Sequence, residues 1–300
     1  MGATARTAVA NCHQLVARLS HVASTFAIRE REAAAVFGVE CRRRPLPCLR
    51  CAALLSVGAS PGRCDLCRKS ERRMAGRWLS RVRLPRAKWL SLVRCFELDL
   101  PVWQSAACTR VSRASAFRAF HTLRLSLASL EPAWEPVLRA FSMGDAAASP
   151  QLFGVEWRGE SVRVSPIPPG PEWRAPGPSD RVLHRDGFLY TAGRAPFEAV
   201  IWNRKVRAPA GRRRRWAREE RRDPFLAFLL NQVAKRYGAR GSHFPLHLRE
   251  CEVRFNHRKG GLFELLLGAL ARPRMRDRPG SQALGPCGLE GSRTGEALRD

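Results

Sequence analysis

The sequence predicts an α/β protein of several domains, and three observations lead to this prediction. Two paired cysteine motifs between residues 48 and 67 indicate a small unit held together by a metal. Apolar residues recur at helical spacing over residues 84–124, alternate with polar residues between 153 and 202, and return to helical spacing from 225 to 270. Since strands followed by helices build layered α/β units, and since 300 residues exceed the usual single domain, we expect two or three folded units.

The composition indicates a folded protein with a polyanionic partner. Hydrophobic residues make up 45% of the chain, which is enough for real cores. The 53 Lys and Arg residues against 26 Asp and Glu residues leave a formal net charge of +27. Such an excess repels itself unless a polyanion neutralises it, so nucleic acid is the natural partner. A coding bias toward arginine explains part of the excess, and a membrane surface is the weaker alternative.

No apolar run is long enough to span a bilayer, and the first residues lack the apolar core of a signal peptide. We therefore expect an intracellular protein with no membrane partner. Residues 1–40 form an N-terminal extension in which we expect one or two amphipathic helices.

A four-cysteine zinc ribbon is predicted over residues 41–82. Two CxxC motifs, Cys48 with Cys51 and Cys64 with Cys67, each place two thiolates on a tight turn. Gly58, Pro61 and Gly62 between them suit the hairpin that would bring the pairs together around one structural Zn²⁺. A redox CxxC or chance clustering is the alternative reading.

A helix-turn-helix is predicted over residues 83–131. Trp89, Leu92, Val93 and Phe96 give one helix an apolar face, and Pro101 opens a second helix. A break at residues 109–111 leads to Ser112, a good N-cap for a third, basic helix. The outward side chains of that helix would contact DNA, and they are Arg113, Ser115, Arg118 and His121. An ordinary three-helix core with a solvated basic face is the alternative.

Strands and then helices fill residues 150–271. A β-hairpin is expected from Phe153 to Val164 around Arg158 and Gly159, with further strands at 181–187 and 198–202. Helices follow from Phe225, from Phe244 and over residues 262–270. This order suits an α/β layer with an RNase H-like pattern.

The run at 254–258, Arg-Phe-Asn-His-Arg, followed by Phe-Glu-Leu-Leu at 263–266, resembles the signature of the zinc-ribbon insertion-sequence transposases related to eukaryotic Merlin elements. The cysteine motifs, the Lys-Trp-Leu stretch at 88–90, the helix at 119–124 and the run at 184–188 support the resemblance, which covers roughly residues 45–270. It implies a DDE/D recombinase that binds the terminal inverted repeats of its element and target DNA, and that assembles as a homo-oligomer on DNA. It also implies a bacterial, cytoplasmic and nucleoid-associated protein.

Three acidic residues in such enzymes hold two Mg²⁺ or Mn²⁺ ions that activate the attacking oxygen. The resemblance assigns the second acid to Asp186 and the third to Asp223. The alternative readings are a turn residue for Asp186 and a helix N-cap for Asp223. The strand that carries the first acid is missing, and Asp145 is the only carboxylate between residues 141 and 151. Leu230 stands where the family has a basic residue.

A basic run is expected to track DNA phosphates, or else to form a solvated loop, and its members are Arg212, Arg213, Arg214 and Arg215. Residues 272–300 are expected to be a flexible tail. The sequence thus predicts a transposase with a truncated RNase H-like domain and impaired cutting. The alternatives are a non-catalytic DNA-binding relic or regulator and, more distantly, an RNA-binding zinc-ribbon protein.

Overall fold

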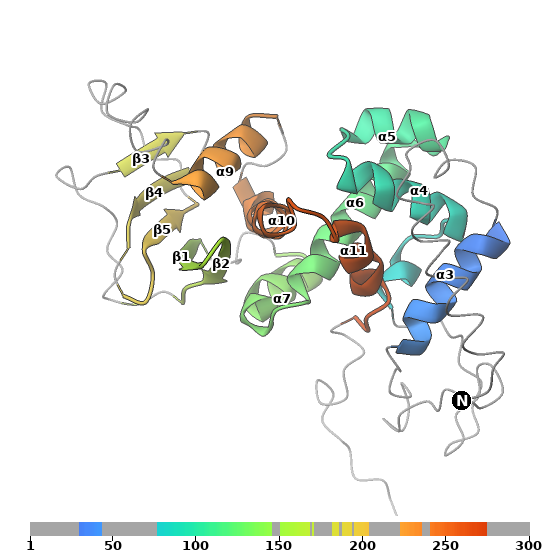
Figure 1. Ribbon diagram of the computed structural model, residues 1–300, viewed down its shortest axis with the longest axis horizontal. Coiled ribbons are helices and arrows are strands. Elements are labelled where there is room, and N and C mark those ends of the chain that lie inside the picture. The colour runs from blue at the N-terminus through green and yellow to red at the C-terminus, as the bar shows by residue number, and fades with distance from the viewer. Residues whose placement is uncertain are drawn as a thin grey trace, which may run out of the picture.

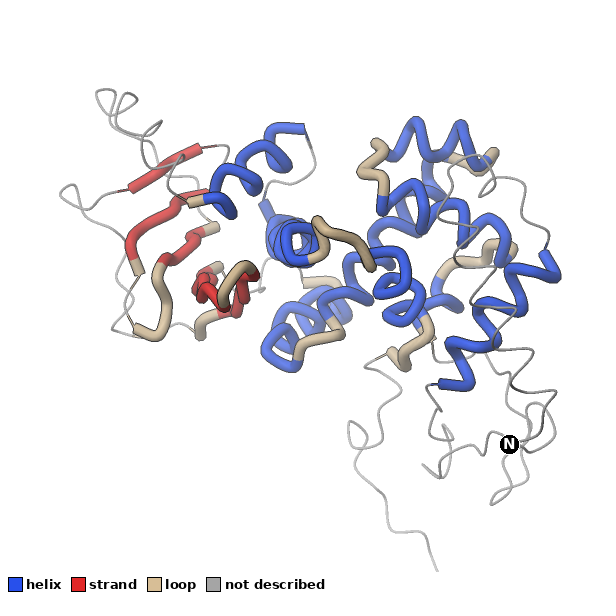
Figure 2. The backbone as a smooth tube through the Cα atoms, viewed as in Figure 1, coloured by secondary structure: helices blue, strands red, loops and turns tan. Residues whose placement is uncertain are grey.

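The chain is a mixed helical and sheet protein in which strands gather at one end and most helices at the other (Figure 2). The computed structural model describes residues 30–43, 77–145, 151–168, 170, 182–185, 188–193, 195–203, 223–235 and 241–274. The four cysteines of the predicted zinc ribbon, at 48, 51, 64 and 67, and the basic run at 212–215 fall outside these ranges. The expected mixture of helix and sheet is confirmed.

The helical end is built from α3 (Glu30–Arg43), α4 (Arg86–Glu97), α5 (Val102–Thr109), α6 (Arg113–Ala128), α7 (Glu135–Met143) and α11 (Leu262–Leu270), with short 3₁₀ turns at Trp78–Arg81 and Pro132–Trp134. The predicted apolar face of α4 is buried, with Trp89, Leu92, Val93 and Phe96 all at most 1% exposed. The carboxylate of Glu30 accepts the backbone N–H groups of Arg86 and Ala87, each at 2.9 Å, and so caps α4.

The centre of the helical end is the second half of α6. Residues 122–129 are all buried, because α4, α5, α10 and α11 all pack on this helix (Figure 1). The first half of the same helix stays largely exposed. One helix therefore belongs both to the core and to the surface.

The sheet has five strands in the order β2-β1-β5-β4-β3, and every pair is antiparallel. The strands are β1 (Leu152–Arg158), β2 (Ser161–Pro166), β3 (Val182–Arg185), β4 (Phe188–Ala192) and β5 (Ala199–Trp202). The predicted hairpin is confirmed, with Arg158 opposite Ser161 and Gly159 in the turn at a φ of 61° that favours glycine.

Helices cover one face of the sheet in the described part of the chain. Phe153 on β1 stacks on Trp134, and Trp157 meets Phe255 of α10 (Phe244–Asn256) edge to face. The helix α9 (Pro224–Lys235) also packs on α10, which therefore lies between the sheet and the helical end (Figure 1). An antiparallel sheet with helices on one face has the layering of an α+β arrangement.

The packing crosses the predicted domain boundaries. One hydrophobic core runs from Ala33 through α6 and the sheet to Leu270. The helix α3 runs three residues past position 40, where the N-terminal extension was expected to end. The helix α7 was not predicted, and its last residues reach into the segment 141–151.

Arg272 and Pro273, where the expected tail begins, make backbone contacts with the helical end. Arg77 pairs with Pro273 in an antiparallel bridge, and the backbone N–H of Trp78 donates to the carbonyl of Arg272 at 3.3 Å. The guanidinium of Arg77 also donates to the carbonyl of Ala271. These bonds tie residues 271–273 to the helical end, and residues 275–300 lie outside the described ranges.

Candidate nucleic-acid interface

The turn between α5 and α6 has the construction that a helix-turn-helix needs. The helix α5 ends in a Schellman motif, in which Val111 N–H donates to the carbonyl of Ala106 and Arg110 N–H donates to that of Ala107. Arg110 takes the left-handed conformation, with a φ of 52°. Val111 is half-buried against the core, and Lys88 Nζ donates to the carbonyl of Thr109 at 2.7 Å. These contacts fix the angle at which α6 leaves the turn.

The crossing of α5 and α6 is close because the residues at the contact are small. Ala106, Ala116 and Ala119 are at most 4% exposed. The N-cap prediction is confirmed, since Ser112 Oγ accepts the backbone N–H of Ser115 at 3.1 Å. The alanines and the cap together hold the first turns of α6 at the surface.

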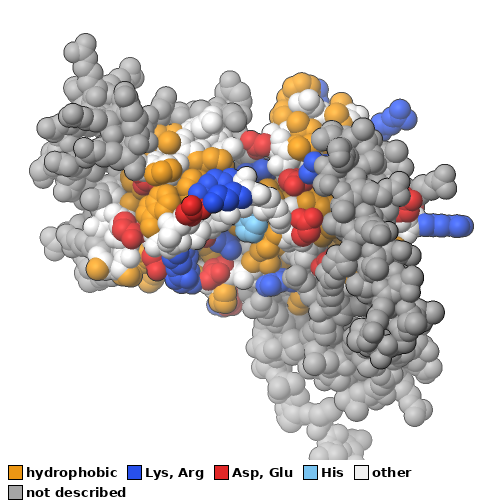
Figure 3. All heavy atoms as spheres, viewed as in Figure 1, with side chains coloured by type: hydrophobic (Ala, Val, Ile, Leu, Met, Phe, Trp, Pro, Cys, Tyr) orange, Lys and Arg blue, Asp and Glu red, His pale blue; other side chains and the backbone are white. Residues whose placement is uncertain are grey.

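Two of the four residues predicted to contact DNA lie open on α6. Arg113 and Arg118 are exposed, five residues apart, and Arg110 is exposed in the preceding turn. Because α6 N–H groups and arginines face outward at the same helix end, this end attracts anions. Basic and acidic side chains lie intermixed over the face seen in Figure 3, so that face carries no single basic patch among the described residues.

The other two predicted residues, Ser115 and His121, are only partly exposed. The Ser115 hydroxyl accepts a hydrogen bond from Ser112 Oγ at 2.9 Å, so it belongs to the helix cap. His121 is half-buried and its ring lies 5.6 Å from that of His243 and 5.9 Å from that of Phe141. Burial, and then the positive charge of Arg81, lower the pKa of His121 to about 4. His121 therefore faces a pocket as a neutral imidazole.

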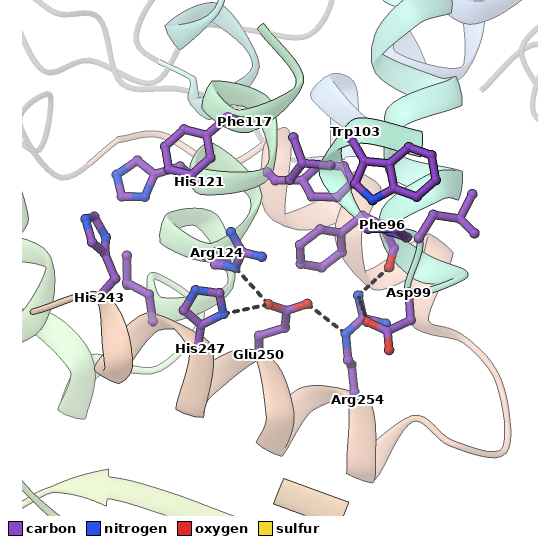
Figure 4. Close-up of a pocket in the computed structure, with 15 residues that line it drawn as sticks. Phe96, Asp99, Trp103, Phe117, His121, Arg124, His243, His247, Glu250 and Arg254 are labelled. Atoms are coloured by element: carbon purple, nitrogen blue, oxygen red, sulfur yellow. Dashed lines mark hydrogen bonds and ion pairs between the residues drawn. The ribbon is translucent and has the colours of Figure 1, made fainter. Parts of the chain in front are cut away.

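That pocket has a volume of about 630 Å³ and lies between α5 and α6 on one side and α10 on the other (Figure 4). Phe117 lies beside His121, which faces His243 at one end of the pocket, and Trp103 lies toward the other end (Figure 4). Trp103 is 60% exposed and Phe117 is 54% exposed, although both are large aromatic side chains.

A charged triad forms the floor of the pocket. Glu250, which is 1% exposed, accepts Arg124 Nε on one carboxylate oxygen and Arg254 Nε on the other, both at 2.8 Å. Both guanidinium groups lie over the ring of Phe96, at 5.7 and 4.7 Å. Arg254 also donates to the carbonyls of Phe96 and Glu97, so α10 is bonded to α4 and α6 together.

Asp223 acts as the N-cap of α9. Its Oδ1 accepts the backbone N–H groups of Phe225 and Leu226 at 2.9 and 3.0 Å, and its Oδ2 accepts the hydroxyl of Tyr190. Burial, and then the charge of Asp223, raise the pKa of Tyr190 far above its usual value, so the phenol stays protonated and donates. The geometry matches the alternative that the sequence left open for Asp223.

Of the other two acids in the expected catalytic set, only Asp145 lies among the described residues. Asp145 is exposed just after the C-cap of α7, where its N–H donates to the carbonyl of Ala140 at 3.0 Å. No group of three His, Cys, Asp or Glu side chains suited to a metal occurs in the described ranges. Asp186, like the four cysteines at 48, 51, 64 and 67 and the arginines at 212–215, lies outside them.

The most specific sequence run, at residues 254–258, has structural contacts that the sequence did not reveal. Asn256 Oδ1 accepts Val162 N–H at 2.8 Å, and its Nδ2 donates to the carbonyl of Val162 at 2.7 Å. Arg258 donates to the carbonyls of Phe255 and Glu160. Through Asn256 and Arg258 the run therefore docks α10 on the β1–β2 hairpin.

Comparison of the chain with known protein families, with curated proteins and with solved structures gives no match. None of the described helices is both long enough and apolar enough to span a membrane.

Proposed function

We propose that this chain binds duplex DNA through α5 and α6 and is a transposase-type protein that has lost DNA cutting. The observation that carries the proposal is the split character of α6. Its buried half is held among four other helices, and its first half presents the exposed side chains of Arg113 and Arg118. A rigidly held basic helix end is what entry into a DNA groove requires.

Charge supports the same function. The net charge of +27 favours any polyanion, and arginine binds phosphates and guanine edges with paired hydrogen bonds. The arginines at 212–215 are proposed to add phosphate contacts that do not depend on sequence.

Selection of bound duplexes from a random pool tests this division of roles. Wild-type protein should enrich one short motif, and Arg113→Ala or Arg118→Ala should relax single positions of it. Alanine at all four positions 212–215 should lower recovery of every sequence alike. Arg139→Ala, which removes an exposed arginine of α7, is the control and should leave the motif unchanged. An unchanged motif in both α6 variants would contradict the proposal.

The loss of cutting is proposed on the state of Asp223 and on the missing first strand. The Asp223 carboxylate already accepts three hydrogen bonds as the N-cap of α9. Of the three acids that such enzymes need, only Asp186 and Asp223 have a counterpart in this sequence. Two acids cannot position both the attacking and the leaving oxygen around two ions. Incubation with end-containing DNA and Mn²⁺ should give no nicking. Nicking that disappears in Asp186→Asn would show that the chain is an active enzyme.

We also propose one structural Zn²⁺ at Cys48, Cys51, Cys64 and Cys67, because paired CxxC motifs at this spacing suit a closed tetrahedral site. Elemental analysis should find one zinc per chain, and Cys64→Ser should lose it. Equal zinc content in the variant would reject the site.

A further inference from the structure

We propose that the pocket between α5, α6 and α10 binds a single unpaired nucleobase of the bound DNA. The inference rests on the proposed DNA-binding function and adds a second, base-binding site to it. The observations that carry it are the position of the pocket, its exposed aromatic side chains and its balanced internal charges.

The pocket is continuous with the proposed DNA-binding end of α6. A shallow groove lined by Val102, Arg113, Ala114, Phe117 and Arg118 shares Val102 and Phe117 with the deeper pocket. Phe117 thus belongs both to the groove with Arg113 and Arg118 and to the pocket with His121. A nucleotide whose phosphates contact Arg113 or Arg118 can place its base past Phe117 without the DNA moving to another face.

The aromatic side chains at the pocket suit stacking on a base. Trp103 and Phe117 are the two most exposed aromatic side chains of the described residues, and both line this pocket. An exposed aromatic ring gains the free energy of burial only when a partner covers it. A nucleobase covers such rings with its own π face, as in proteins that bind single strands or extruded bases.

The polar groups of the pocket suit a neutral ligand better than a phosphate. Arg124 and Arg254 already donate to Glu250, and Arg254 also lies 3.8 Å from Asp99. The imidazoles of His121 and His243 face each other, and burial lowers the pKa of both, so near pH 7 they offer one donor and one acceptor each without charge. Neutral donors and acceptors around an aromatic wall match the edge of a base.

The volume fits the same ligand. About 630 Å³ is within the range of small-molecule sites, and it is large enough for a base with part of its sugar.

Three duplexes of the same length test the inference with the full chain: one fully paired, one with a single bulged adenine, and one with an abasic bulge. Wild-type protein should bind the adenine bulge on the order of tenfold more tightly than the abasic bulge, because stacking is lost without the base. Trp103→Ala should abolish that difference and keep the affinity for paired DNA. Met143→Ala, which removes another exposed apolar side chain outside the pocket, should keep the difference.

Equal affinity for the two bulges, or a preference that persists in Trp103→Ala, would overturn the inference and leave the duplex-binding function standing. Binding to none of the duplexes would overturn both. Competition with anilinonaphthalene sulfonate, a probe of apolar surface, is the second readout. If the probe fluoresces in wild-type protein but not in Trp103→Ala, it binds in this pocket. If saturating bulged DNA then fails to displace it, the pocket is a docking site for a protein side chain and the nucleobase proposal is rejected.

Discussion

His121 illustrates how burial changes the role of a residue that the sequence marks as basic. Helical spacing aligns it with Arg113 and Arg118, but α10 and α7 bring His243 and Phe141 against it. The positive charges of Arg81 and Arg124 then add to the cost of protonating it. His121 is a neutral part of a pocket wall.

Protonation of His121 should destabilise the fold as the pH falls. The folded-state pKa of about 4 lies below the usual 6.5, so the folded protein binds fewer protons between these values and loses stability from pH 6.5 toward pH 4. The expected contribution at pH 5 is about 1–2 kcal/mol. Urea denaturation at pH 7 and pH 5 should show this loss in wild-type protein and a smaller one in His121→Gln. An equal loss in both proteins would contradict the burial argument.

The positions of the helices and strands were easier to predict from the sequence than the contacts between them. The periods of apolar residues predicted the hairpin β1–β2 and the helices α4, α5, α6, α9, α10 and α11 to within a few residues. They could not predict α7, because Pro132 and Pro136 near its start read as helix breakers although proline is tolerated in a first turn. The packing of α10 on the β1–β2 hairpin was not predictable either, because it depends on contacts such as that of Asn256 with Val162, which lie 94 residues apart in the sequence.

The docking of α10 should depend on Glu250 more than on any surface ion pair. Glu250→Gln would leave Arg124 buried without its carboxylate and Arg254 with only Asp99 at 3.8 Å, and breaking a buried pair costs about 3–5 kcal/mol. Glu135→Gln breaks the exposed Glu135–Arg139 pair of α7 and should cost at most about 1 kcal/mol. Chemical denaturation of both variants measures the two costs. Similar costs would mean that the triad does not hold α10.

At the scale of the whole molecule, α6 packs the predicted helix-turn-helix at 83–131 against helices of the predicted domain at 150–271. The core is continuous from α3 to α11, so the predicted helix-turn-helix at 83–131 shares its buried side with helices more than a hundred residues later. A boundary drawn from Pro, Gly and Ser content cannot detect such packing, because local composition carries no information about distant contacts. The RNase H-like identity of the sheet stays a prediction.

A fragment of residues 83–131 should fail to fold alone. Without α10 and α11 it would expose Leu123, Leu125 and Leu127, which are at most 1% exposed in the whole chain. Circular dichroism should show no cooperative thermal transition in the fragment, whereas the full chain should show one. A cooperative transition in the fragment would mean that the helix-turn-helix is an independent domain.

The salt dependence of duplex binding tests the central claim most directly. The logarithm of affinity should fall steeply and linearly with the logarithm of salt concentration, because each neutralised phosphate contributes about 0.9 to the slope. Arg113→Ala with Arg118→Ala should make the slope shallower by about 2. The control pair Arg139→Ala with Arg158→Ala removes two exposed arginines elsewhere and should leave it unchanged. Equal slopes in the two double variants would contradict DNA binding through α6.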